Sequence, residues 1–241
     1  MFMDPTLPIT LRFTPMDNTY RLTQEGSAEL TLEDLQALKH QYPVVIGAGD
    51  QSLPVVLIEP TDMELPLGGY LPEPVQLYPF SLVEPPALYL DDGMLLMDHP
   101  VILVECTAPH WFGHCGYRLW DDEEQFTPFM HQIRDRLQSL HHSMTRTRTL
   151  VQILEQAGVL RLINLYHNGV LQWVYTVDPV ALEQQYEWFD QDDQGLSAIM
   201  LADALLVSQA QLVELDGTWM TRSVYEHWVQ PLSPGDYVRP C

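Results

Sequence analysis

Basic residues are scarce in this 241-residue chain. Lysine and arginine together number 11, against 33 acidic residues, and the formal net charge is −22 at pH 7. Lys39 is the only lysine. Nucleic acids and anionic membrane surfaces are bound through clusters of basic side chains. The composition therefore predicts a protein that binds no nucleic acid, and it favours a cationic partner or a salty environment.

Cysteine and long apolar runs are also scarce. Cys106, Cys115 and Cys241 are the only cysteines, and an odd, low number does not build a disulfide framework. No apolar run reaches the roughly 18 residues of a membrane span. The first ten residues carry an acid and no basic group, unlike a signal peptide. We therefore expect no membrane insertion, and a cytoplasmic protein by default, with envelope association as the alternative.

The common catalytic and nucleotide-binding motifs are missing. The chain contains no GxSxG, P-loop, GxGxxG or HExxH sequence. The members of a Ser/His/Asp triad lie far apart in sequence, so a triad has no local signature. The sequence nominates no catalytic residue, and we expect a protein without enzymatic activity.

The chain does contain a long amphipathic helix, predicted over about 128–157. Thr127 is a good N-cap, and Pro128 suits the first helical position, where the N–H has no partner. Gly158 follows the helix, where a left-handed residue is favoured. Apolar residues recur between these ends at steps of three and four, with Thr147 filling one gap: Phe129, Ile133, Leu137, Leu140, Met144, Val151 and Leu154.

Strand-like segments lie on both sides of this helix. Asn168-Gly169, between the apolar runs 160–166 and 170–177, predicts a type I′ hairpin. The runs 44–46 and 55–58 predict a second hairpin. The proline-rich segment 54–100 predicts loops with short strands near 87–91 and 94–97. We expect aromatic side chains to anchor such loops by packing: Tyr70, Tyr78, Phe80 and Trp120.

Two more helices are predicted near the end of the chain, over 178–189 and over the apolar segment 196–210. These elements together predict an α+β fold, in which a mixed or antiparallel sheet of hairpins packs against helices 128–157 and 196–210. We expect residues 1–217 to form a single domain. Residues 218–241, rich in Trp, Tyr and Pro, are predicted to form an irregular tail packed on it.

Two groups of residues suggest binding chemistry. One contains two thiols and two imidazoles within ten residues: Cys106, His110, His114 and Cys115. This group fits a soft zinc or redox site, but Pro109 and Gly113 indicate a loop and the spacing matches no standard zinc motif. An aromatic loop with incidental Cys and His is the other interpretation. We predict no cofactor, with zinc at these four residues as the alternative.

The second group lies on the long helix, which carries four of the 11 basic residues. Ion pairs with surface acids are their ordinary role. The alternative is a docking face for an anionic partner, either a protein or a small-molecule ligand, formed by Arg134, His142, Arg146 and Arg148. His142 and Arg146 share a helix face at i,i+4. A homodimer is a further alternative, built on the tail aromatics Trp219, Tyr225 and Trp228.

An ordered series of short motifs over about residues 30–212 resembles the bacterial SapC family. It includes Tyr42-Pro43-Val44-Val45, Tyr78-Pro79-Phe80, Leu119-Trp120, Thr127-Pro128, Tyr175-Thr176-Val177-Asp178, and Gly195-Leu196 with Ser208. The family takes its name from a bacterial surface-layer system. The resemblance implies a non-enzymatic accessory or binding protein of a surface or envelope system, and brings no catalytic residues. The alternative is a metal-dependent or peptide- or small-molecule-modifying enzyme that uses the 106–115 loop. This chain departs from the family at Trp120, where Phe is usual, and over 106–117.

Overall fold

The structure is a computed structural model that describes residues 12–18, 21, 25–48, 52–58, 70–83, 88–90, 93–95, 101–111, 116–123 and 125–229. Its main sheet has seven strands in the order β12-β13-β10-β11-β3-β4-β2. In chain order these are β2 (Ser27–Glu29), β3 (Val44–Gly47), β4 (Pro54–Leu57), β10 (Leu160–His167), β11 (Val170–Val177), β12 (Leu212–Leu215) and β13 (Thr218–Thr221). All neighbours pair antiparallel except β10 and β13, which are parallel. The predicted α+β class with a mixed sheet is confirmed.

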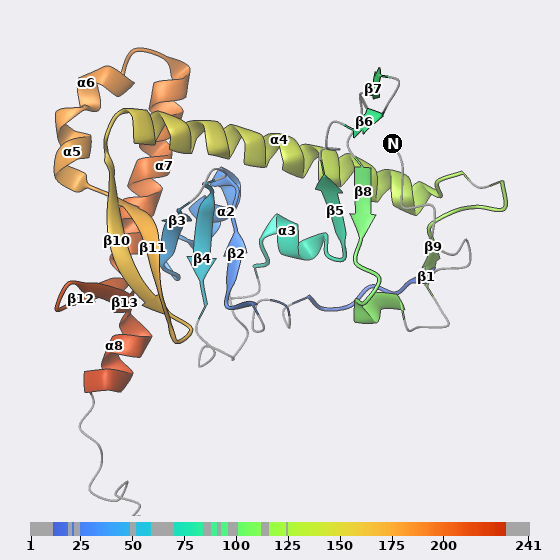
Figure 1. Cartoon of the computed structure of the whole chain (residues 1–241), viewed down its shortest axis with the longest axis horizontal. Helices are drawn as coiled ribbons and strands as arrows, with labels where there is room; N and C mark the ends of the chain where they lie inside the picture. The colour runs from blue at the N-terminus through green and yellow to red at the C-terminus, as the bar shows by residue number, and fades with distance from the viewer. Residues whose placement is uncertain are drawn as a thin grey trace, which may run out of the picture.

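One long helix, α4 (Pro128–Gln156), runs along the whole molecule (Figure 1). The Thr127 hydroxyl accepts the N–H of Met130, and Gly158 has a φ of 69° just after the helix ends. The predicted cap, start and stop are therefore confirmed, to within one residue at the end.

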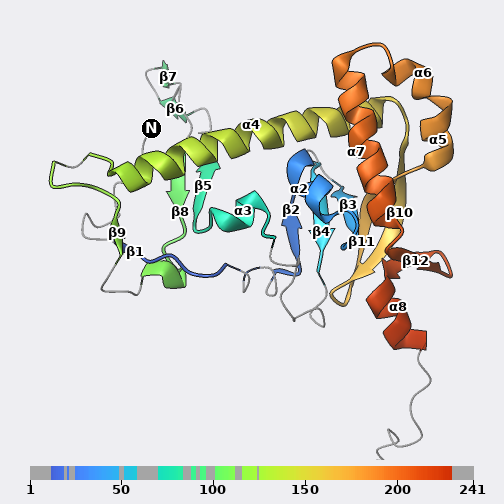
Figure 2. The same ribbon diagram turned by 180° about the vertical axis from the view of Figure 1, so that it is seen from behind.

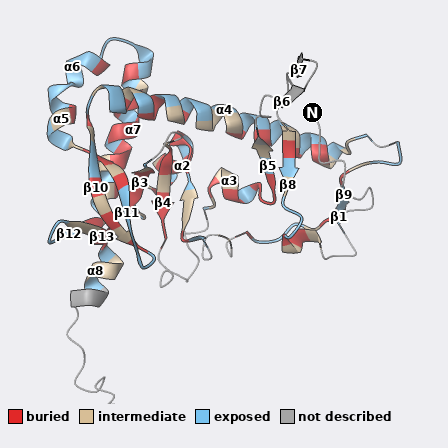
Figure 3. Ribbon diagram, viewed as in Figure 1, coloured by how far each residue is buried: buried red, intermediate tan, exposed pale blue. Residues whose placement is uncertain are grey.

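Helix α4 joins two separate apolar cores along its buried side (Figure 3). Its second half, with Leu150, Val151 and Leu154, packs into the core between the main sheet, α2 (Leu32–Leu38) and α7 (Asp193–Gln209). Its first half, with Met130, Ile133 and Leu137, packs into a smaller core. That core also includes residues of β1 (Arg12–Phe13), β5 (Phe80–Val83) and β8 (Val101–Val104). The helix thereby fixes the position of one end of the molecule relative to the other.

The smaller end is built from short elements (Figure 2). Strand β5 pairs with β8, and β1 pairs with β9 (Tyr117–Arg118). Strands β6 (Leu88–Leu90) and β7 (Gly93–Leu95) form a third pair. Their residue ranges are close to those predicted for the two short strands, 87–91 and 94–97. The helix α3 (Glu73–Gln76) and the 3-10 turn η2 (Pro109–Trp111) complete it.

Two buried polar residues tie α2 to its neighbours. The Asp34 carboxylate accepts hydrogen bonds from the Thr31 N–H at 3.0 Å, the Tyr70 hydroxyl at 2.7 Å and the Glu73 N–H at 3.2 Å. The Thr147 hydroxyl, in the apolar stripe of α4, accepts the Leu32 N–H at 3.0 Å. An N–H in the first turn of a helix has no acceptor within that helix. The Thr147 hydroxyl therefore supplies the acceptor for this N–H of α2.

The last third of the chain differs from the predictions in two places. The helix expected over 178–189 is split into α5 (Pro179–Gln184) and α6 (Tyr186–Phe189). The predicted helix 196–210 begins earlier, because the Asp192 side chain accepts the Gly195 N–H as an N-cap.

The prediction of an irregular tail is wrong for residues 218–229, which form β13 and α8 (Arg222–Val229). Asp216 and Gly217 both have positive φ, at 49° and 80°, and turn β12 back into β13. Strand β13 then pairs with β10 inside the main sheet, so the boundary expected at residue 217 falls in a hairpin. Residues 230–241 lie outside the described part. No helix in the described part of the chain is long and apolar enough to cross a membrane.

Candidate functional site

A cavity of about 630 Å³ lies beside the first half of α4. Three further segments contribute to its wall: the stretch that follows β1, the α3–β5 connection, and β9. Its lining consists of Phe13, Pro15, Met16, Asn18, Gln76, Leu77, Tyr78, Phe80, Tyr117, Arg118, Thr127, Pro128, Phe129, Gln132, Ile133 and Arg136. We call this the aromatic cavity.

The segment 12–18 forms one wall of the aromatic cavity and is fixed near its start by β9. Phe13 pairs with Tyr117, and the Thr14 N–H donates to the His110 carbonyl at 3.0 Å. Gly116 has a φ of 154°, and a Cβ atom there would overlap the Phe13 carbonyl. The absence of a side chain at Gly116 therefore lets β1 approach β9.

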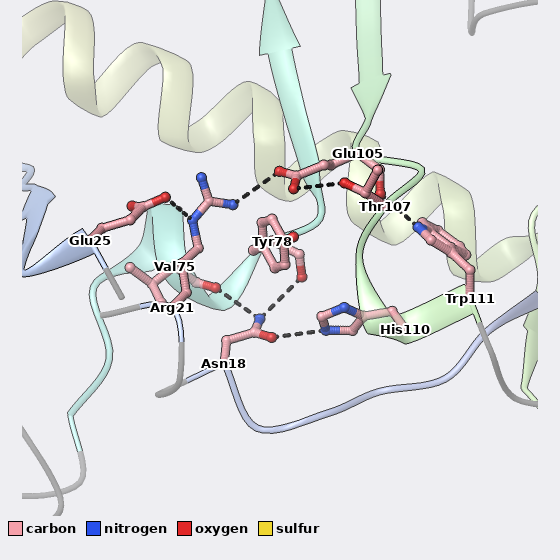
Figure 4. Close-up of polar contacts among 9 residues, drawn as sticks. All are labelled: Asn18, Arg21, Glu25, Val75, Tyr78, Glu105, Thr107, His110 and Trp111. Carbon is pink, nitrogen blue, oxygen red and sulfur yellow. Dashed lines mark hydrogen bonds and ion pairs between the residues drawn. The ribbon is translucent and has the colours of Figure 1, made fainter. Parts of the chain in front are cut away.

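The same segment is fixed at its end by Asn18 (Figure 4). The buried Asn18 amide donates to the Val75 carbonyl at 2.9 Å and to the Tyr78 carbonyl at 3.1 Å. Its Oδ1 atom lies 2.8 Å from Nε2 of His110. The Asn18 amide nitrogen is used as a donor, so Oδ1 is the acceptor and His110 carries a proton on Nε2.

His110 is fully buried and packs between two aromatic rings. The Phe13 ring is stacked on it at 5.3 Å and the Tyr78 ring meets it edge-on at 5.4 Å. Burial lowers the pKa of the imidazole below its usual value of 6.5. Nδ1 has no hydrogen-bond partner within the described residues, so the neutral form with the proton on Nε2 fits the site. We interpret His110 as a support for segment 12–18.

An ion-pair chain lies on the outer side of Tyr78 (Figure 4). The Arg21 guanidinium sits 4.0 Å from the centre of the Tyr78 ring and pairs with Glu25 at 2.9 Å and Glu105 at 3.6 Å. The Trp111 indole N–H donates to the Glu105 carbonyl at 2.7 Å. These contacts connect the β8–η2 loop to the residues that follow Asn18.

Aromatic rings form the floor of the cavity. Phe129, in the first turn of α4, stacks on Phe13 at 5.3 Å and on Tyr117 at 4.6 Å. Phe80 contacts both phenylalanines at 5.2 and 6.3 Å. Met16 and Tyr117 remain 47% and 53% exposed, so the cavity opens to solvent on their side.

Two arginines supply the only charged groups among the described lining residues. Arg118 pairs with Asp122 at 2.8 Å, and Arg136 contacts Glu73 at 3.5 Å and the Gln76 amide oxygen at 3.1 Å. No carboxylate, histidine, cysteine, serine or lysine side chain is among the described lining residues. The cavity can therefore bind an anionic group beside apolar surface, and its described hydroxyl groups are those of Tyr78, Tyr117 and Thr127.

The Cys/His loop is described only in part. Cys106 is exposed, whereas His110 is buried and hydrogen-bonded to Asn18. His114 and Cys115 lie outside the described residues. Among the residues that are described, no group of three or more His, Cys, Asp or Glu side chains could hold a metal ion. The zinc alternative at these four positions therefore stays a prediction.

The predicted docking residues on α4 have different surroundings. Arg134 pairs with its neighbour Asp135 at 2.7 Å. His142 and Arg146 are exposed, and the His142 Nδ1 lies 2.7 Å from the Gln138 carbonyl. Arg148 is half-buried near Glu29: burial raises the pKa of that carboxyl, and the Arg148 charge lowers it. The helix therefore directs these groups to different neighbours.

The predicted aromatic anchors all make tertiary contacts. Tyr78 and Phe80 are buried and line the cavity, and Trp120 packs at the edge of the smaller core. Tyr70 lies farther along, bonded to Asp34. The prediction missed Asn18 and Arg118 as parts of the site. Neither has a local sequence signal, because each is an isolated polar residue in a short segment.

Comparison with known proteins gives one result. A protein-family model described as SapC matches residues 9–184. The match covers well over half of the chain and includes every described residue that lines the aromatic cavity. It ends before α7, so the Gly195-Leu196 and Ser208 motifs lie beyond it. No curated protein and no solved structure matches the chain.

Proposed function

Because the chain belongs to the SapC family, we propose that it is a non-enzymatic binding protein of a bacterial surface or envelope system, with the aromatic cavity as its binding site. The surface or envelope role rests on the resemblance stated above. The choice of binding over catalysis rests on the chemistry of the cavity lining.

The observation that carries this proposal is the contrast between the cavity and the rest of the chain. The chain has a net charge of −22, yet the described lining has two arginines and no carboxylate. A volume of about 630 Å³ lies within the range of small-molecule sites, which are mostly apolar with a few placed polar groups. The described residues of the alternative enzymatic loop, 106–111, do not line this cavity.

The same contrast indicates the kind of ligand. Stacked aromatic rings favour a flat or apolar group, and guanidinium groups favour a carboxylate, sulfonate or phosphate. The acids elsewhere on the surface repel anions at long range. Charges farther away than about 8 Å are largely screened at physiological ionic strength, so the nearest charges are the two arginines and their partners Asp122 and Glu73, whose pairing leaves guanidinium N–H donors for a ligand. We therefore expect the cavity to bind an anion with an apolar body.

Anilinonaphthalene sulfonate, a fluorescent aromatic anion, tests the proposal. Met16→Glu places a carboxylate at the open side of the cavity, where Met16 is 47% exposed. Met200→Glu is the matched control, because Met200 is 56% exposed on α7 and does not line the cavity. We expect saturable binding by the wild type, at least about tenfold weaker binding by Met16→Glu, and no change for Met200→Glu. Equal binding by all three proteins would overturn the proposal.

A further inference from the structure

The two arginines of the aromatic cavity are fixed well apart along α4. The Thr127 hydroxyl donates to the Arg118 carbonyl at 2.7 Å, which attaches β9 to the start of the helix. Arg136 lies on the helix itself, nine residues after Thr127. At a rise of 1.5 Å per residue, this places the two attachment points about 13 Å apart along the helix axis.

Each guanidinium keeps donors for a further anion. Arg118 uses Nη1 to contact Asp122, whose side chain is 93% exposed, and Arg136 uses Nη2 to contact Glu73 and Gln76. A guanidinium has five N–H donors, and surface ion pairs of this kind contribute little to stability. The existing contacts therefore orient the two arginines and leave most of their donors available.

Phe129 of the aromatic floor lies between the two attachment points along the helix. Phe129 follows Thr127 by two residues and precedes Arg136 by seven, and it stacks on both Phe13 and Tyr117. The open side near Met16 gives a bound chain a way in and out. The cavity lining thus contains one cation attached at the start of the helix, apolar rings next to it and a second cation attached farther along the helix.

An extended peptide of five residues can span the distance between the two attachment points. Side chains at i, i+2 and i+4 of an extended chain point to one face, and residues i and i+4 are about 13 Å apart. We propose that the aromatic cavity binds an extended acidic segment of a partner protein, with the pattern acid–x–aromatic–x–acid. The two acids pair with Arg118 and Arg136, and the aromatic residue packs on Phe129. This inference rests on the proposed function, because it assumes that the cavity is a binding site.

A labelled peptide with the sequence Glu-Ser-Phe-Ser-Glu, blocked at both ends, tests the pattern by fluorescence anisotropy. The protein variants are Arg118→Gln and Arg136→Gln, with Arg134→Gln as the control, because Arg134 is on the same helix and does not line the cavity. We expect each cavity variant to weaken binding about tenfold and Arg134→Gln to bind like the wild type. We expect the neutral peptide Gln-Ser-Phe-Ser-Gln to bind at least about tenfold more weakly than the acidic peptide. The shorter peptide Glu-Phe-Glu cannot reach both arginines, so we expect only one of the two arginine substitutions to weaken its binding.

Three results would overturn the inference: equal binding of the acidic and neutral peptides, equal loss in Arg134→Gln and Arg136→Gln, or full competition by a small aromatic carboxylate such as benzoate at the same concentration. Anilinonaphthalene sulfonate separates the two proposals. If the dye binds in a Met16-dependent way while no peptide binds, the inference fails and the proposed function stands. If neither dye nor peptide binds, both fail.

Discussion

Nε2 of His110 lies 2.8 Å from Oδ1 of Asn18, the last residue of segment 12–18, and both side chains are buried. The contact joins residues 92 positions apart in sequence. Asn18 also holds two carbonyls of the α3–β5 connection. This one amide therefore links segment 12–18 to the α3–β5 connection and to η2, a turn that supports the aromatic cavity without lining it.

His110 makes the stability of the protein depend on pH. Its pKa in the folded protein is below 6.5 because the ring is buried, so the unfolded chain binds the proton more readily. The wild type should lose stability as pH falls from about 7.5 to about 5.5. His110→Gln should flatten this loss, and His40→Gln, at an exposed histidine, should not. Urea unfolding at several pH values measures it. Parallel curves for wild type and His110→Gln would contradict the expectation.

Asp34 should be the most sensitive acid of the larger end. Asp34→Ala leaves the Tyr70 hydroxyl and the Glu73 N–H without their acceptor and removes the capping box of α2. We expect a loss of roughly 2–4 kcal/mol in the free energy of unfolding. Glu33→Ala, at the exposed neighbour, should change it by less than about 0.5 kcal/mol. Similar denaturant midpoints for the two variants would argue against this role of Asp34.

Tyr70, the hydrogen-bond partner of Asp34, makes the stability of the protein depend on alkaline pH. Burial, and then the hydrogen bond to Asp34, raise the pKa of the Tyr70 hydroxyl above its usual value of 10. Above that pH the unfolded chain loses the proton while the folded protein keeps it, so stability should fall as pH rises. Tyr70→Phe should lessen this alkaline loss, measured by thermal unfolding between about pH 9 and 11. An unchanged slope in Tyr70→Phe would count against the interaction.

Thr147 allows a closely matched comparison. Its hydroxyl accepts the Leu32 N–H and donates to the Ser143 carbonyl, whereas the exposed Thr149 hydroxyl donates only to the Thr145 carbonyl. Thr147→Val keeps the shape but leaves a buried N–H unpaired, which should cost about 1–3 kcal/mol. Thr149→Val should be near neutral. Calorimetry on both variants measures the two losses of stability. Equal losses would mean that the hydrogen bond from α2 to Thr147 contributes nothing to the stability of the protein.

Gly195 should not tolerate a side chain. A Cβ atom there would overlap the backbone carbonyl of Phe189, because α7 begins directly against α6. Gly195→Ala should therefore lower the free energy of unfolding by about 1–3 kcal/mol. Gly47→Ala is the control, since a Cβ at that position meets no atom within 4 Å. If Gly195→Ala were as stable as Gly47→Ala, the close packing of α6 on α7 would be refuted.

Local signals in the sequence predicted local structure well. Thr127, Gly158 and Asn168-Gly169 gave the ends of α4 and the hairpin that follows, because caps and turns depend on a few adjacent residues. The parallel pairing of Trp219 with Leu165 joins distant segments and has no such signal. The aromatic composition of residues 218–229 therefore suggested an irregular tail where the chain forms a strand and a helix.

The candidate site was predictable only in part, for a related reason. Tyr78 and Phe80 were expected to pack as anchors, and Phe129 belonged to the predicted stripe of α4. Nothing in the sequence showed that segment 12–18 would face them. Arg136 was not among the predicted docking residues, yet it lines the cavity, whereas the predicted Arg148 lies near Glu29. The tertiary packing on each side of α4 decides this difference.

The most direct test of the aromatic cavity as a binding site is methyl NMR of the protein labelled with ¹³C at its ten methionines. The signals of Met16 and Met200 can be assigned from Met16→Leu and Met200→Leu variants. When anilinonaphthalene sulfonate is added, the ring current of a ligand in the cavity should shift the Met16 methyl signal saturably and leave Met200 unchanged. A Met200 shift with no change at Met16 would contradict binding in the cavity, as would the absence of any saturable shift.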